Sequence, residues 1–200
     1  MTDRLNNLLR ELKYLWLTPV GFFYCLFMNL LLLLIGVNDG SGAVRDQALS
    51  EMFSNQEWML LLLNLVIAPI LEELLFRKLL YQKLFREKLG VRVLFSALVS
   101  AAVFAVLHLN VPQGIYAFFL GLVLCETLEH TGSLAAAVFV HAAANLFTIL
   151  VNRYEALNEF LYTLRIPAMI AGLLIFLLAL GLFYQVYAPE RLRFLKKNRE

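Results

Sequence analysis

Long apolar runs separated by short polar segments dominate the chain. A helix of about 20 apolar residues crosses the hydrocarbon core of a bilayer, so these runs predict membrane helices. The fourth run is the shortest, and we expect its helix to tilt little or to be partly re-entrant. The pattern predicts an all-α, polytopic membrane helix bundle with about six transmembrane helices, over approximately Tyr14–Val37, Glu57–Phe85, Val91–Leu109, Gln113–Leu128, Leu134–Val151 and Ile166–Tyr187.

Turn-forming residues mark the breaks between these helices. The segment Asn38–Gly42 follows the first helix, Val111-Pro112 separates the third from the fourth, and Thr131-Gly132-Ser133 separates the fourth from the fifth. The sequence contains no internal repeat and no low-complexity linker. Residues 1–200 are therefore predicted to form a single integral membrane domain, with its chemistry-bearing core at about residues 58–151.

Composition supports a membrane protein. Hydrophobic residues make up 61% of the chain and charged residues 16%, against about 45–50% and 25% in soluble domains. The basic residues cluster beside apolar runs, so no nucleic-acid partner is expected. Cys25 and Cys125 each lie within an apolar run, where we expect them to pack as small residues rather than form a disulfide or a metal pair.

The distribution of basic residues predicts an orientation. With six spans, the N-terminal segment, the segment after Glu73 and the C-terminal tail fall on one side of the membrane, with 14 Lys and Arg residues. The other side has only Arg45, Arg153 and Arg165. Because cytoplasmic loops are enriched in Lys and Arg, both termini are predicted to be cytoplasmic.

Five polar residues stand out within the apolar helices: Glu72, Glu73, His108, His141 and Asn145. A charged side chain at the centre of a membrane helix costs roughly 2.5–3.5 kcal/mol, so such residues usually face a polar interior and act there. Glu72 is predicted about 21 Å, and His108 about 24 Å, from the basic loop that joins their helices, at 1.5 Å per residue. His141 is predicted somewhat lower. These depths make a shared site plausible, and they favour a membrane enzyme.

Spacing along each helix predicts the local partners. Glu73 and Arg77 are four residues apart, so an ion pair between them would offset the cost of both charges and leave Glu72 to act as a base. For Arg77 we therefore expect a structural role, as an ion-pair partner or a snorkelling residue. Phe104 is four residues before His108 and would form a wall beside the imidazole.

Three short motifs then resemble a known family. Glu72-Glu73-Leu74-Leu75-Phe76-Arg77 fits the pattern EExxxR, Phe104–His108 fits FxxxH, and His141–Asn145 fits HxxxN. In this order on membrane helices, they resemble the CPBP family of intramembrane proteases, which includes type II CAAX prenyl endopeptidases and bacteriocin-processing or bacteriocin-immunity (Abi) proteins. The resemblance covers about Trp58–Val151.

The resemblance implies an intramembrane endopeptidase. In that interpretation Glu72 is the general base that activates water, with help from Glu73. His108 orients the water or polarises the scissile carbonyl, and His141 and Asn145 stabilise the oxyanion. No cofactor is assigned, and zinc stays open because Glu72, His108 and His141 also match a His₂Glu zinc set. Glu72 cannot readily be both ligand and sole base, so we favour a metal-free glutamic mechanism.

Two other functions remain open from the sequence. A proton-coupled transporter could use Glu72, His108 and His141 as a relay, although inverted repeats and paired broken helices are missing. A non-catalytic bacteriocin-immunity protein or membrane adaptor could retain the fold. For the enzyme, the expected partners are the lipid bilayer and a membrane-embedded or lipidated peptide or protein, and the expected location is the inner (cell) membrane of a prokaryote.

Overall fold

The structure is a computed structural model that describes residue 9 and residues 11–37 and 57–197, with only the backbone described for residue 57 and residues 188–197. Within these residues the chain is helical, without strands. The helices are η1 (Leu12–Leu17), α2 (Thr18–Leu34), α4 (Glu57–Leu62), η2 (Leu63–Ile67), α5 (Ala68–Glu72), η3 (Glu73–Lys88), α6 (Val93–Val106), α7 (Val111–Thr131), α8 (Leu134–Arg153), α9 (Glu155–Thr163) and α10 (Arg165–Lys197).

Five helical stretches of the described chain are long and apolar enough to cross a membrane: Leu12–Leu34, Trp58–Lys88, Val111–Thr131, Leu134–Arg153 and Arg165–Tyr187. The remaining predicted span corresponds to α6, an apolar helix of 14 residues. The predicted all-α, polytopic bundle is therefore confirmed. The predicted turn at residues 38–42 lies outside the described residues.

The short helix is α6 and not, as predicted, the fourth. Asn110 caps α7 because its side chain accepts a hydrogen bond from the Gln113 backbone N–H at 2.9 Å, and Pro112 lies in the first turn, where its missing N–H costs nothing. The break between the third and fourth predicted helices therefore lies at residues 107–110, just before Val111-Pro112, and Pro112 lies at the beginning of a helix of 21 residues. Because α6 ends at Val106, His108 lies in the turn beyond the helix and not within it.

The second predicted helix is continuous but irregular. From Trp58 to Lys88 the chain stays helical, yet in η2 and η3 the backbone hydrogen bonds run from each N–H to the carbonyl five residues earlier, and α5 lies between these wider segments. Such segments free individual carbonyl groups and often occur at functional sites.

Two features were not predicted: α9 after Arg153, and the extension of α10 to Lys197.

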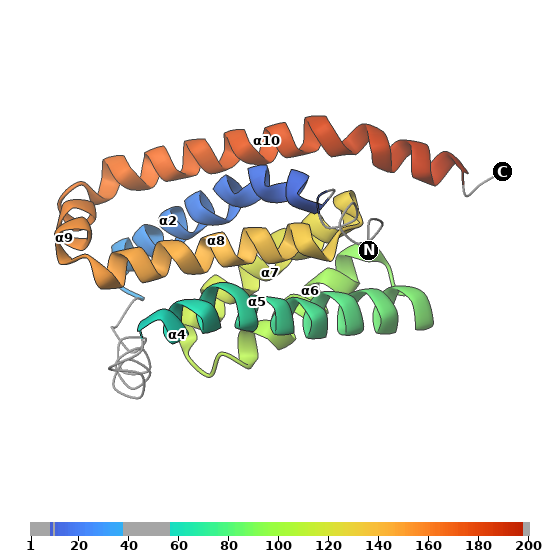
Figure 1. The fold of residues 1–200 in the computed structure, drawn as a ribbon, viewed down its shortest axis with the longest axis horizontal. Helices are drawn as coiled ribbons and strands as arrows, with labels where there is room; N and C mark the ends of the chain where they lie inside the picture. Colours follow the sequence, from blue (N-terminus) through green and yellow to red (C-terminus); the bar gives the residue numbers. More distant parts are fainter. Residues whose placement is uncertain (1–8, 10, 38–56, 198–200) are drawn as a thin grey trace.

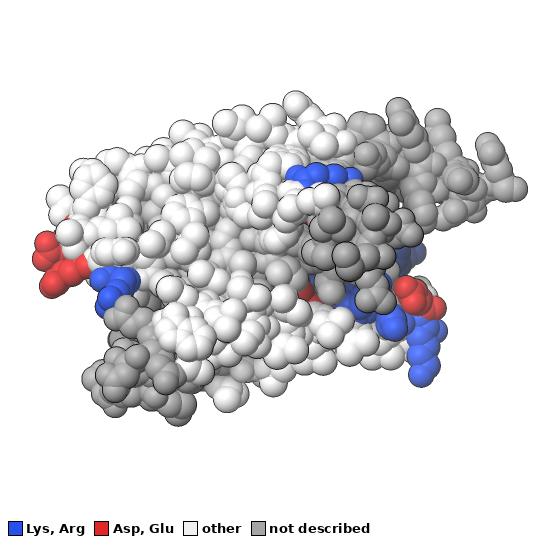
Figure 2. Space-filling view, viewed as in Figure 1, with Lys and Arg blue, Asp and Glu red and all other residues white. Residues whose placement is uncertain are grey.

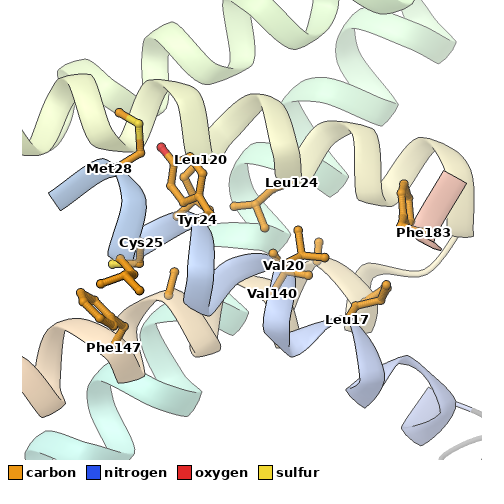
Figure 3. Close-up of a cluster of buried hydrophobic side chains, with 14 of the residues drawn as sticks. Leu17, Val20, Tyr24, Cys25, Met28, Leu120, Leu124, Val140, Phe147 and Phe183 are labelled. Atoms are coloured by element: carbon orange, nitrogen blue, oxygen red, sulfur yellow. The ribbon is translucent and has the colours of Figure 1, made fainter. Parts of the chain in front are cut away.

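The long helices lie side by side along roughly one direction, and α9 lies across one end between α8 and α10 (Figure 1). α10 packs on α2, which packs on α8, while α6 packs on α7 and η3. The main core lies among α2, α7, α8 and α10, and Figure 3 shows Leu17, Val20, Leu124, Val140 and Phe183 within it. This core holds α8 in place, and His141 of α8 reaches the junction between α5 and η3.

Charged side chains gather toward the two ends of the molecule on the face seen in Figure 2, with other residues between them. The start of η1, the end of η3 and the end of α10 lie at one end, and α9 lies at the other (Figure 1). Arg153 and Arg165 flank α9. Arg45 and parts of both terminal basic segments lie outside the described residues, so the cytoplasmic orientation stays a prediction.

Both cysteines are free and buried, as expected for packing residues.

Candidate active site

Glu72 and Glu73 meet His141 where α5 passes into η3. His141 Nδ1 lies 2.9 Å from Glu73 Oε1, and His141 Nε2 lies 3.6 Å from Glu72 Oε2. The imidazole is buried, with 3% of its residue surface exposed. A carboxylate can only accept, so Nδ1 carries the proton of the Glu73 contact. The contact between His141 Nε2 and Glu72 Oε2 is attractive only when one of these two atoms carries a proton. The His141 ring therefore links the protonation of Glu72 to its contact with Glu73.

Glu73 is held by Arg77, as the spacing of four residues predicted. The Arg77 Nε lies 3.2 Å from Glu73 Oε2, and both side chains are 0% exposed, so Arg77 does not snorkel. None of the three guanidinium nitrogens has a well-aligned hydrogen bond within the described residues. The guanidinium instead lies 4.4 Å from the centre of the Phe104 ring, a cation–π contact in a dry environment. Charge and ring stacking hold this pair.

Phe104 is the common neighbour of the site. Its ring meets the His108 ring edge-to-face at 4.7 Å, and it meets the His141 ring in the same manner at 5.8 Å. With the Arg77 guanidinium, three side chains of the motifs pack on one buried ring. The sequence predicted the Phe104–His108 contact, but it did not predict that the same ring would reach His141 on α8.

His108 is oriented by the end of its own helix. Its Nδ1 lies 2.8 Å from the Phe104 carbonyl oxygen, one of the carbonyls that the end of α6 leaves without a helical partner. Because a carbonyl only accepts, Nδ1 carries the proton, and in the neutral ring Nε2 holds a lone pair. His108 is thereby prepared to accept a proton or a hydrogen bond at Nε2.

A cavity of about 180 Å³ lies between Glu72 and His108, and Phe76, Phe104 and Leu107 complete its lining. A water molecule needs about 10–15 Å³ of such space, so several fit. The Glu72 side chain is 35% exposed, in contrast to the enclosed Glu73. The two adjacent glutamates therefore differ: Glu73 is held in the ion pair that the spacing predicted, and Glu72 is accessible, while its role as a base stays a prediction.

Asn145 lies one turn beyond His141 on α8 and does not line this cavity. Its Nδ2 donates to the Asn64 backbone carbonyl in η2 at 2.9 Å. An amide nitrogen has two hydrogens, so this bond fixes the side chain and leaves a second donor. Sequence reasoning missed this contact, because it involves a backbone carbonyl and not the Asn64 side chain.

The residues do not gather as zinc ligands. Within the described part of the chain, no three His, Cys, Asp or Glu side chains are grouped so that they could hold a metal ion. His141 Nδ1 is occupied by Glu73, and its Nε2 faces the Glu72 carboxylate. Glu72, His108 and His141, the zinc set considered from the sequence, do not form such a group in the described residues, and the metal-free mechanism stays a prediction.

The other polar residues of the motif region have structural contacts. Tyr81 donates to Glu129 Oε2 at 2.7 Å, and Tyr184 donates to Glu126 Oε1 at 3.0 Å. The His130 Nδ1 lies 3.2 Å from Glu126 Oε1. These contacts tie η3 and α10 to the end of α7, away from the cavity.

An apolar groove of about 490 Å³ lies on another side of α8. Phe22 and Phe23 of α2, Leu65 of η2, and Ala142 and Leu146 of α8 are among the residues that line it. Ala142 follows His141 directly, and Leu65 follows Asn64, so two residues of the groove are sequence neighbours of residues of the polar site.

Comparisons with known proteins find similarity to membrane peptidases. Residues 54–147 match the family described as type II CAAX prenyl endopeptidase Rce1-like. A Bacillus subtilis (strain 168) protein named "Putative membrane peptidase YdiL" is 23% identical over 146 residues, which cover 70% of this chain and 57% of that protein. No solved structure gives a significant match. The resemblance seen in the three motifs is confirmed, because residues 54–147 are similar to the Rce1-like family of type II CAAX prenyl endopeptidases.

Proposed function

We propose that the protein is an intramembrane endopeptidase that hydrolyses peptide bonds of membrane-embedded or lipidated substrates with a water molecule activated by Glu72. The observation that carries the proposal is the difference in environment between two adjacent glutamates. Glu73 is neutralised by Arg77, while Glu72 faces a cavity opposite His108. The family match supports a peptidase, and the apolar spans support an integral membrane protein.

In the proposed reaction a water molecule lies between Glu72 and His108. Glu72 takes a proton from this water, and the oxygen attacks the scissile carbonyl carbon. When the C–N bond breaks, the same proton passes from Glu72 to the leaving nitrogen. General acid–base catalysis by one positioned group contributes about 10²–10⁴-fold. His108 accepts at Nε2 in its neutral form, and it therefore orients the water rather than polarising the carbonyl.

The oxyanion would be stabilised from α8. His141 offers Nε2 beside Glu72 when the ring is protonated. Asn145 lies one turn further along α8, outside the cavity lining, and would offer the N–H that Asn64 does not use only to a substrate that extends from the cavity to α8. Loss of one such donor costs about 2.7–4 kcal/mol of transition-state stabilisation in other hydrolases. His141 also keeps the charges near balance, because two glutamates face one arginine and one protonatable ring.

We place the apolar part of the substrate in the groove beside Ala142. A lipid chain or an apolar peptide segment there would lie next to the polar cavity, and helical substrates must unwind locally before hydrolysis because their amides are paired internally. Ala142→Leu should narrow the groove and raise KM for a lipidated peptide while kcat changes little. An unchanged KM would contradict this placement.

The proposed location is the inner (cell) membrane of a prokaryote, with both termini cytoplasmic. In the described residues, Lys83, Arg86, Lys88 and Arg92 lie around the end of η3. A cysteine introduced at exposed Lys88 should react with a membrane-impermeant thiol reagent only after the cytoplasmic side is opened. Labelling of this cysteine in intact cells would contradict the predicted orientation.

The function is tested by reconstituting wild-type protein beside Glu72→Ala, His108→Ala and His141→Ala. Prenylated peptides, unmodified membrane peptides and leader peptides are offered, and mass spectrometry identifies the products. Cleavage that disappears in all three variants supports one proteolytic site. Cleavage that persists in every variant contradicts it, and proton transport in sealed vesicles without cleavage would favour the transporter.

A further inference from the structure

The Asn64 carbonyl has lost the backbone donors that would normally serve it. In an α-helix this carbonyl would accept from Ala68 N–H, but that N–H goes to the Leu63 carbonyl, five residues back. With the same wider spacing, the donor to Asn64 would be residue 69. Residue 69 is Pro69, which has no N–H. The carbonyl is left for a partner outside its own helix.

Asn145 is that partner, with Nδ2 at 2.9 Å. A carbonyl within a membrane has few water molecules to accept from, and an unsatisfied one raises the free energy of the folded protein. The hydrogen bond from the Asn145 amide removes that cost. Pro69 itself is fully buried, which fixes the segment from which the carbonyl projects. The carbonyl, in turn, fixes the amide one turn from His141.

We propose that Pro69 is a positioning residue for Asn145: by withholding a backbone N–H, it keeps the Asn64 carbonyl free to orient the Asn145 amide. This rests on the proposed function only as far as Asn145 acts in hydrolysis. The hydrogen-bond arrangement itself can be tested without any enzymatic activity.

Pro69→Ala restores a donor. In the wider spacing the new N–H of residue 69 serves the Asn64 carbonyl, and if the segment returns to a regular α-helix, Ala68 N–H serves it instead. In both cases a backbone N–H competes with the Asn145 amide for the Asn64 carbonyl. The substitution removes a proline from the interior of a helix, which favours stability, and it empties part of a buried position, which opposes it. The test therefore depends on how the two substitutions couple and on the decline in catalysis.

The experiment is a double-mutant cycle of Pro69→Ala and Asn145→Ala, with Pro167→Ala as a control because Pro167 lies exposed in the first turn of α10. The midpoint of thermal unfolding in detergent is measured for all proteins. Asn145→Ala should lower the midpoint in the protein that keeps Pro69. It should lower the midpoint much less in the Pro69→Ala background, where the carbonyl has a backbone donor. Additive shifts would overturn the proposal.

The same proteins are assayed on a peptide that the wild type cleaves. Pro69→Ala should lower kcat about tenfold or more with KM nearly unchanged, since small displacements of positioned groups cost up to about 10²-fold. In the Asn145→Ala background, Pro69→Ala should have no further effect on kcat. An equal decrease in both backgrounds would show a general structural effect and refute the positioning role. If the wild type cleaves nothing, the proposed function fails, and the unfolding cycle still decides the inference.

Discussion

Replacing Arg77 with methionine removes the positive charge from an enclosed ion pair. Both side chains of the Glu73–Arg77 pair are 0% exposed, so no solvent screens the carboxylate that remains. Removing one partner of a buried pair typically costs about 3–5 kcal/mol, and we expect Arg77→Met to lower the free energy of unfolding by that amount. The loss of the cation–π contact with Phe104 adds to it.

The assay is denaturant unfolding in detergent, with Lys78→Met as the matched control. Lys78 is the next residue of η3, is half-buried, and donates only to Gln82 among the described contacts that involve its side chain, so its loss should cost under about 0.5 kcal/mol. The double variant Glu73→Gln/Arg77→Met should regain part of the stability, because a neutral amide needs no counter-charge. A decrease for Arg77→Met no larger than that of the control would refute the buried-pair reasoning.

Three further substitutions test the packing that positions the site. Gly21→Ala should destabilise the protein by about 1–3 kcal/mol in the same assay, because the added Cβ would overlap the Val140 backbone carbonyl where α2 crosses α8; a neutral result would contradict that close approach. Tyr81→Phe should cost about 1.5 kcal/mol, since its hydroxyl donates to the Glu129 carboxylate, and unchanged stability would mean that this bond contributes nothing. Asn110→Ala should cost about 1 kcal/mol by uncapping α7, whereas Asn110→Asp, which still accepts, should retain most of the stability; equal losses would rule out the cap.

Sequence patterns were sufficient where the interaction is local. The spacing of Glu73 and Arg77 predicted their ion pair, and the spacing of Phe104 and His108 predicted their ring contact, because neighbours three or four residues apart share a helix face. The apolar runs likewise predicted the membrane helices. Each of these follows from helical periodicity alone.

Contacts between helices were harder to predict from the sequence. The depth of His141 could not be fixed by counting from Ser133, and its close contact with Glu73 depends on how α8 packs against α5 and η3. The link from Asn145 to a backbone carbonyl depends on irregular hydrogen bonding that apolar periodicity does not reveal. One signal was present: Pro69 stands five residues after Asn64, where it removes a donor.

Misplaced helix ends had a local cause. Pro112 was interpreted as a break, although a proline preceded by a capping asparagine also begins helices. With α7 starting at Val111, the apolar run before it must contain both α6 and the turn that carries His108. The catalytic interpretation of His108 gains from this, because the end of α6 supplies the carbonyl that fixes its ring.

The central claim, that Glu72 activates water without a metal, is tested most directly by comparing Glu72→Gln with Glu87→Gln in chelator-treated protein. The two changes are isosteric, and Glu87 lies exposed on the same helix, outside the cavity. With a peptide that the wild type cleaves, we expect full activity in the chelated wild type and in Glu87→Gln, and a loss of about 10²–10⁴-fold or more in Glu72→Gln. Activity that disappears on chelation and returns with zinc, or Glu72→Gln protein that cleaves at the wild-type rate, would contradict the account.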